Sequence, residues 1–129
     1  MRRGFSLLEL LVVLVVLSIL AAIAVPLYLA QRDKAKDCAT EMNVRNLAIA
    51  CGSWYDIDHY CPAASDMTPA GVGQFLSRWP TNPFSGRPVA LSAAIAPGDF
   101  AYESDGDTYT ITGWLHDGSP WTFGSGGGL

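Results

Sequence analysis

Glu9 is an acidic side chain within an otherwise unbroken apolar run, and it is the only charged residue between Phe5 and Ala30. Placing a carboxylate in hydrocarbon costs on the order of 2.5–3.5 kcal/mol even on a lenient insertion scale. A buried charge therefore needs a partner of opposite sign, and this segment supplies none. The chemistry indicated is an ion pair with a cation from another copy of the chain. The alternative is a single-pass anchor that holds Glu9 at the level of the lipid headgroups.

Three cysteines are the next candidates for chemistry. Cys38 and Cys51 would lie about 20 Å apart along a predicted helix, and a disulfide requires Cα atoms within about 7 Å. A predicted turn separates Cys51 from Cys61, so in an oxidising exterior these two are expected to close a loop, worth roughly 3 kcal/mol. Cys38 would then be left over, buried between subunits or against the predicted sheet.

Asp105 and Asp107 are weak candidates for calcium ligands at the tip of a predicted hairpin. The segment fails the helix–loop–helix calcium pattern, because Tyr109 and Thr110 occupy places that need an oxygen ligand and a glycine. We therefore interpret the two carboxylates as an acidic turn and predict no metal site.

No pattern in the chain indicates catalysis. Gly71-Val72-Gly73 is not a dinucleotide fingerprint, because no strand precedes it and no third glycine follows. The sequence also lacks a nucleophile elbow. His59 and Cys61 beside Cys51 form a disfavoured zinc alternative. The sequence predicts a protein that is not an enzyme and needs no cofactor.

The element that must carry Glu9 is long enough to cross a membrane. As a helix, residues 5–30 would reach about 39 Å, against a hydrocarbon core of ~30 Å. No small-x-small cleavage site follows the run, so it is not an ordinary secretory signal. Pro26 lies inside it and is expected to kink the helix, at ~3 kcal/mol if uncompensated. Alternatively, Pro26 ends the membrane helix and a separate helix begins.

A second helical stretch follows the apolar run. Residues 31–58 lack proline and have no glycine before Gly52. One side of this helix carries apolar residues at three- and four-residue spacing, which predicts packing against a sheet. These residues are Val44, Leu47, Cys51 and Trp54.

The remainder of the chain is predicted to hold a connecting loop and a small sheet. Six prolines interrupt residues 59–98, so regular structure there must be short. Residues 99–124 alternate large with small or polar side chains around the turn signal Asp105-Gly106, which predicts an antiparallel meander. Residues 125–129 form a glycine-rich tail that we expect to be flexible. The sequence thus predicts an α+β fold.

Composition limits the classes of function. The chain has 129 residues, 50% of them hydrophobic, and a net charge of −4. About a hundred residues follow the apolar run, enough for one modest domain. Beyond Arg45 the only Lys or Arg residues are Arg78 and Arg87. A phosphate-tracking surface needs a basic patch, so we expect no direct nucleic-acid binding.

The N-terminus resembles that of type IV pilins and of the type II secretion pseudopilins. The resemblance rests on Gly4-Phe5-Ser6-Leu7-Leu8-Glu9, the apolar run after it, and Pro26. It implies that a prepilin peptidase in the inner membrane removes residues 1–4 and methylates the new terminus at Phe5. It also implies that Glu9 pairs with the Phe5 ammonium of a neighbouring chain. Loss of Arg2 and Arg3 would lower the net side-chain charge from −4 to −6.

The resemblance further implies a pilin-like fold and a structural role. The expected function is that of a filament subunit, stored in the inner membrane with its head outside the cytoplasm and polymerised by an assembly platform and its ATPase. A true type IV pilin and a secretion pseudopilin are both open. The turn at residues 79–86 resembles that of the family, but Asn82 and Phe84 depart from the strict secretion form. An alternative function from a different class is that of a membrane-tethered binding domain that never polymerises.

Overall fold

The computed structural model describes residues 4–92 and 95–125. The chain divides into two units, Met1–Lys34 and Ala35–Leu129. The first three residues of the expected leader, and all of the expected tail beyond residue 125, lie outside the described residues.

One long helix, α1 (Leu7–Asp58), accounts for the N-terminal half of the chain. It is continuous through Pro26, so no separate helix begins there; the kink itself stays a prediction. Within the first unit, every residue from 4 to 32 is exposed. This part of α1 is long and apolar enough to cross a membrane. A helix that is apolar on all sides needs an apolar environment, either lipid or other helices.

The second unit holds a three-stranded antiparallel sheet of β1 (Phe100–Ser104), β2 (Tyr109–Trp114) and β3 (Pro120–Gly124), in the order β1-β2-β3. Tyr102 pairs with Ile111, and Ile111 pairs with Phe123. A long helix and a C-terminal antiparallel sheet make the predicted α+β, pilin-like fold, which is confirmed.

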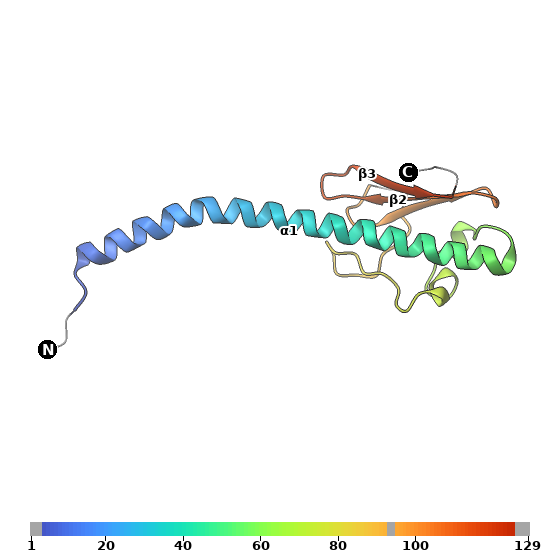
Figure 1. Cartoon of the computed structure of the whole chain (residues 1–129), viewed down its shortest axis with the longest axis horizontal. Helices are drawn as coiled ribbons and strands as arrows, with labels where there is room; N and C mark the ends of the chain where they lie inside the picture. The colour runs from blue at the N-terminus through green and yellow to red at the C-terminus, as the bar shows by residue number, and fades with distance from the viewer. Residues whose placement is uncertain (1–3, 93–94, 126–129) are drawn as a thin grey trace. The chain divides into compact units, whose positions relative to one another are not determined.

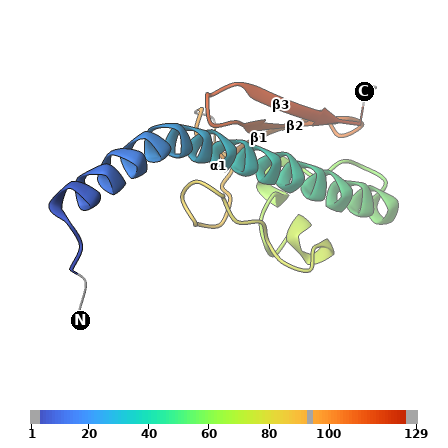
Figure 2. The same ribbon diagram turned by 60° about the vertical axis from the view of Figure 1, so that its left-hand side comes forward.

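The sheet covers one side of the second half of α1, and the connecting loop covers another (Figures 1 and 2). This loop contains two short 3-10 helices, η1 (Ala64–Asp66) and η2 (Val72–Phe75). Prolines and positive-φ turns keep its regular structure short.

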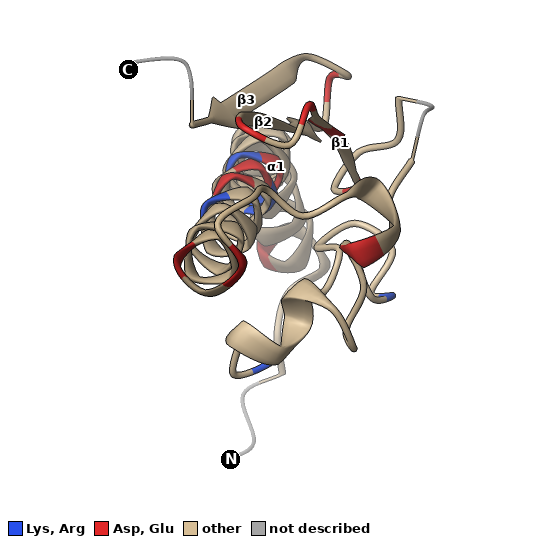
Figure 3. Ribbon diagram, turned by 90° about the vertical axis from the view of Figure 1, so that its right-hand side faces the viewer, with Lys and Arg blue, Asp and Glu red and all other residues tan. Residues whose placement is uncertain are grey.

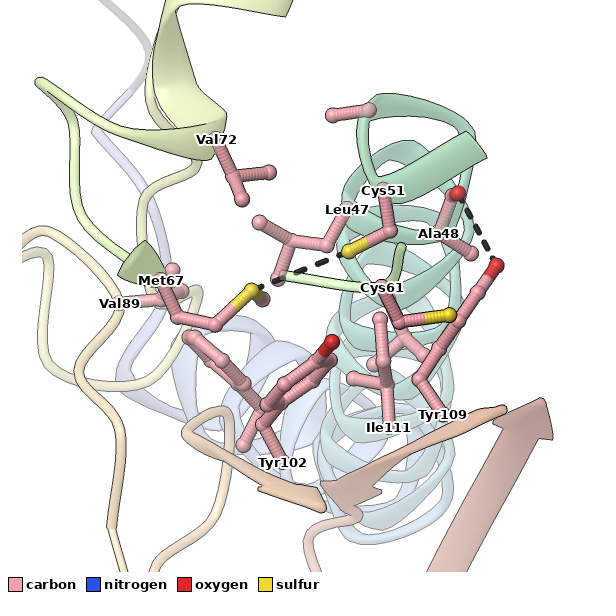
Figure 4. Close-up of a cluster of buried hydrophobic side chains, with 13 residues drawn as sticks. Leu47, Ala48, Cys51, Cys61, Met67, Val72, Val89, Tyr102, Tyr109 and Ile111 are labelled. Carbon is pink, nitrogen blue, oxygen red and sulfur yellow. Dashed lines mark hydrogen bonds between the residues drawn. The ribbon is translucent and has the colours of Figure 1, made fainter. Parts of the chain in front are cut away.

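The core lies between α1, the loop and the sheet (Figure 4). The predicted helix stripe faces it, with Val44, Leu47 and Cys51 at most 1% exposed. Two tyrosine hydroxyls fasten the layers: Tyr109 donates to the carbonyl of Ala48 at 3.1 Å, and Tyr102 to that of Pro62 at 2.7 Å. The buried hydrophobic residues are Val44, Leu47, Ala48, Ala50, Cys51, Cys61, Met67, Val72, Val89, Phe100, Tyr102, Tyr109 and Ile111.

Gly113 of β2 lies in close contact with α1. A Cβ at this position would lie 2.7 Å from Val44 Cγ2 and 3.2 Å from Thr40 Cγ2. Val44 is β-branched and therefore stiff at χ1, so it cannot move aside cheaply. The absence of a side chain at Gly113 lets β2 lie directly on α1.

We expect Gly113→Val to lower the free energy of unfolding of the head by about 1–3 kcal/mol, the usual cost of overpacking. Urea unfolding of the detergent-solubilised full chain, followed by tryptophan fluorescence, measures this. Thr112→Val changes the same strand on its other face and should have little effect. In a double-mutant cycle, Val44→Ala should relieve part of the Gly113→Val cost. Strict additivity of the two changes would contradict the packing described.

Candidate processing and assembly site

The predicted processing residues lie just before α1. A Cβ added at Gly4 would meet no heavy atom within 4 Å beyond its chain neighbours, and Phe5 is 80% exposed. Ser6 caps the N-terminus of α1: its hydroxyl oxygen accepts a hydrogen bond from the N–H of Leu8 at 3.2 Å. This capping satisfies a backbone donor at the helix start. Gly4 and Phe5 are thus left as accessible, non-helical backbone ahead of a defined helix start.

Glu9 lies in the first turn of α1. A negative side chain is favoured there, because the helix N-terminus carries a partial positive charge. Glu9 forms no ion pair with another of the described residues. In the middle of the apolar run, the hydroxyl of Ser18 donates to the carbonyl of Leu14 at 2.7 Å. Glu9 is therefore the charged group of this segment that needs a partner of opposite charge when it is buried.

In the acidic turn between β1 and β2, the carboxylate of Asp105 is occupied by hydrogen bonds within the turn. The carboxylate of Asp105 accepts the N–H of Thr108 at 2.6 Å, the N–H of Asp107 at 3.0 Å and the hydroxyl of Thr108 at 3.1 Å. These hydrogen bonds, led by the Thr108 N–H, hold the pKa of Asp105 below its usual value. Gly106 supplies the positive φ of 94° that the turn needs. Within residues 4–92 and 95–125, no cluster of three or more His, Cys, Asp or Glu side chains is placed to hold a metal ion.

Acidic residues gather at the end of the head where α1 ends. Figure 3 shows Asp and Glu at the end of α1 and at the turn between β1 and β2. A groove of about 460 Å³ lies between these two places, and Ile49, Tyr55, Asp56, Cys61 and Asp107 are among its lining residues.

All three cysteines are free in the structure. Cys51 and Cys61 are both buried in the core. The disulfide predicted between them stays a prediction. Cys38 is exposed, which corrects the expectation that it packs against the sheet. The reason is its position on α1, on the side away from Val44 and Leu47.

Three contacts that fasten the head onto α1 were not predicted from the sequence. His116, in the turn after β2, donates its backbone N–H to Asp37 at 2.8 Å, and its ring Nδ1 lies 2.5 Å from the same carboxylate. The guanidinium of Arg45 lies 5.3 Å from the ring centre of Trp121. Lys36 Nζ lies 5.1 Å from the ring centre of Phe84, at a cation–π distance.

Asn82 organises the proline-rich turn that departs from the secretion form of the family. Its amide donates to the carbonyl of Pro97 at 3.0 Å and to the carboxylate of Asp99 at 2.9 Å. Its side-chain oxygen accepts the N–H groups of Phe84 and Ser85 at 2.8 and 3.1 Å. An aspartate at this position would lack the amide donors and would bring a second carboxylate beside Asp99. The hydrogen-bond partners around residue 82 therefore fit asparagine, the residue by which this chain differs from the secretion form.

Comparison with known proteins places the N-terminal segment in a defined class. Residues 1–25 match the family model described as the prokaryotic N-terminal methylation motif, the signature of type IV pilins and pseudopilins. The searches of curated proteins and of solved structures each found no match. The motif supports a pilin-like substrate of a prepilin peptidase, and the motif and the apolar N-terminal helix fit a membrane-anchored precursor.

Proposed function

We propose that this chain is a structural subunit of a type IV pilus-like filament. A prepilin peptidase cleaves it between Gly4 and Phe5 and methylates Phe5, and the mature chain polymerises through its N-terminal helix. The observation that carries the proposal is Glu9, the only charged residue of the apolar segment 5–30, in which every residue is exposed, and its place in the first turn of α1 within the methylation motif.

Processing is supported by the local structure around the scissile bond. A peptidase must accept an extended backbone, and Gly4 offers one without a side chain. Phe5 is exposed and precedes the helix, so cleavage would not require α1 to unwind. Cleavage also creates a positively charged amino terminus at Phe5, a group of the charge that pairs with Glu9.

Polymerisation is supported by the surface of the first unit. Its large hydrophobic residues are exposed, from Leu7 at 87% to Leu29 at 42%. A helix stored in lipid can enter a filament only if the filament core is also apolar, because exposing this surface to water is unfavourable. In that core, the Phe5 ammonium of one chain and Glu9 of its neighbour form a buried pair, which is tolerable where a lone charge is not. The head then forms the outer coat.

The proposal applies to a true pilin and to a secretion pseudopilin alike, since both use the same N-terminal segment. Partners under either assignment are further copies of the chain, the inner-membrane assembly platform and its ATPase. The competing function is a membrane-tethered domain that remains a monomer. It would need no partner for Glu9.

Fractionation of cells producing the full chain tests the proposal. We expect mechanical shearing to release filaments, and mass spectrometry to identify peptides of residues 35–125 in them. A strain without the assembly ATPase is the control and should retain all of the chain in the inner membrane. A chain that stays in the membrane in both strains, with a functioning assembly system verified by another subunit, would contradict the filament role and favour the tethered domain.

A further inference from the structure

Two thiols from different elements share the core of the head. Cys51 belongs to α1 and is 0% exposed, and Cys61 belongs to the loop after it and is 4% exposed. Figure 4 shows both sulfur atoms inside the cluster that also holds Met67, Tyr102 and Tyr109. The thiol of Cys51 lies 3.8 Å from the sulfur of Met67.

The backbone around Cys61 is held in place on this core. The chain reverses at His59, which adopts φ 59° and donates its N–H to the carbonyl of Tyr55 at 2.9 Å. Cys61 donates its own N–H to the carbonyl of Gly106 at 2.7 Å. The next carbonyl, of Pro62, accepts the hydroxyl of Tyr102 at 2.7 Å. The fold therefore returns Cys61 to the helix it has just left and fixes it there.

We propose that Cys51 and Cys61 are a modification site that is joined as a disulfide once the head is outside the cytoplasm. The structure describes the dithiol form of this site. The location rests on the proposed export of the head, whereas the pairing rests on the burial of both thiols in one cluster and on the fixed backbone of Cys61. The partner chemistry is a thiol–disulfide oxidoreductase, the class of oxidant found in such compartments.

The two cysteines have different parts in the exchange. Cys61 lines the groove beside Asp107 and is the thiol that an oxidant can approach. Burial, followed by the charge of Cys61, raises the pKa of the Cys51 thiol to about 12. Burial, followed by the charges of Asp105 and Asp107, also raises the pKa of Cys61, so access sets the order of reaction. Because Cys61 lines the groove and Cys51 is not among its lining residues, Cys61 reacts first and Cys51 second.

The bonds made and broken balance in two steps. The Cys61 thiolate attacks one sulfur of the oxidant's disulfide, and the other sulfur of the oxidant leaves as a thiolate. The Cys51 thiolate then attacks the Cys61 sulfur of the mixed disulfide and releases the oxidant as a dithiol. The protein loses two electrons and two protons, and the oxidant gains the two electrons.

The disulfide would tie the end of α1 to the start of the loop. This loop segment also carries the contact to the β1–β2 turn through Gly106. Closing a loop of this size shifts the folding equilibrium by on the order of a hundredfold in the chain-entropy model.

Refolding of the purified full chain in detergent tests the pairing without any filament. The reduced, denatured chain is refolded with oxidised glutathione, free thiols are alkylated, and the product is cleaved before aspartate. Asp56 and Asp58 lie between the two cysteines, so their fragments stay joined only by a disulfide. We expect a joined pair lighter by two hydrogens, with Cys38 alkylated. Alkylation of both Cys51 and Cys61, or a link to Cys38, would overturn the proposal.

Single variants test the order of reaction. With Cys51→Ala, glutathione should remain attached to Cys61 as a mixed disulfide. With Cys61→Ala, native Cys51 should stay unmodified. Cys38→Ala is the matched control and should keep the Cys51–Cys61 link. Trapping at Cys51 that equals trapping at Cys61 would overturn the assigned order. Because the oxidant is glutathione in vitro, none of these results depends on the filament role.

Discussion

Glu9→Leu is expected to remain in the membrane and to lose filament assembly. The change removes the cost of a carboxylate in an apolar run, so membrane insertion should be at least as favourable as in the wild type. In the filament, however, the Phe5 ammonium of each neighbour would be buried without its counter-charge. Leaving one member of a buried pair alone costs about 3–5 kcal/mol, which is more than a hundredfold in equilibrium at each subunit addition.

The measurement is the amount of sheared filament at equal membrane levels of variant and wild type. Ser18→Leu is the matched control, because it also replaces a polar side chain of the apolar run by leucine. The Ser18 hydroxyl is already satisfied by Leu14, so this control should assemble normally. Folding of the head should be unchanged in both variants, since residues 35–125 are not altered. Equal filament yields for Glu9→Leu and wild type would mean that Glu9 does not drive assembly and would favour the tethered domain.

Gly4→Val is expected to abolish processing, which is the second large effect. A β-branched side chain restricts the backbone on which the peptidase acts, whereas Gly4 leaves it open. The variant should accumulate in the membrane with its leader attached and should carry no methyl group. Intact-mass measurement of the membrane form checks this. Ala21→Val makes the same kind of change in the exposed apolar helix and should be processed as the wild type is. Normal cleavage of Gly4→Val would contradict the assigned site.

Periodicity and local motifs were sufficient to predict the main elements. The apolar run with Glu9, the helix stripe around Leu47 and the turn signal Asp105-Gly106 each express a local rule of helix, burial or hairpin geometry. Such rules operate within a few residues and need no knowledge of the rest of the fold. The helix, the sheet and the length and apolarity of the N-terminal segment follow from them.

Contacts between distant segments could not be predicted in the same way. Asp37 and His116 are 79 positions apart in the chain, and neither lies in a pattern that marks it. Gly113 looked like an ordinary strand residue, although its lack of a side chain sets the approach of β2 to α1. The exposure of Cys38 depends on which side of α1 the sheet covers. These features arise from tertiary packing, which spacing along the sequence does not encode.

The N-terminal mass of the chain in assembled filaments tests the central claim most directly. Sheared filaments are purified, and the terminal peptide is identified by mass spectrometry. The account predicts a chain that begins at Phe5 and carries one methyl group on its amino nitrogen. Assembled material that begins at Met1, or a Phe5 terminus without the methyl group, would contradict it.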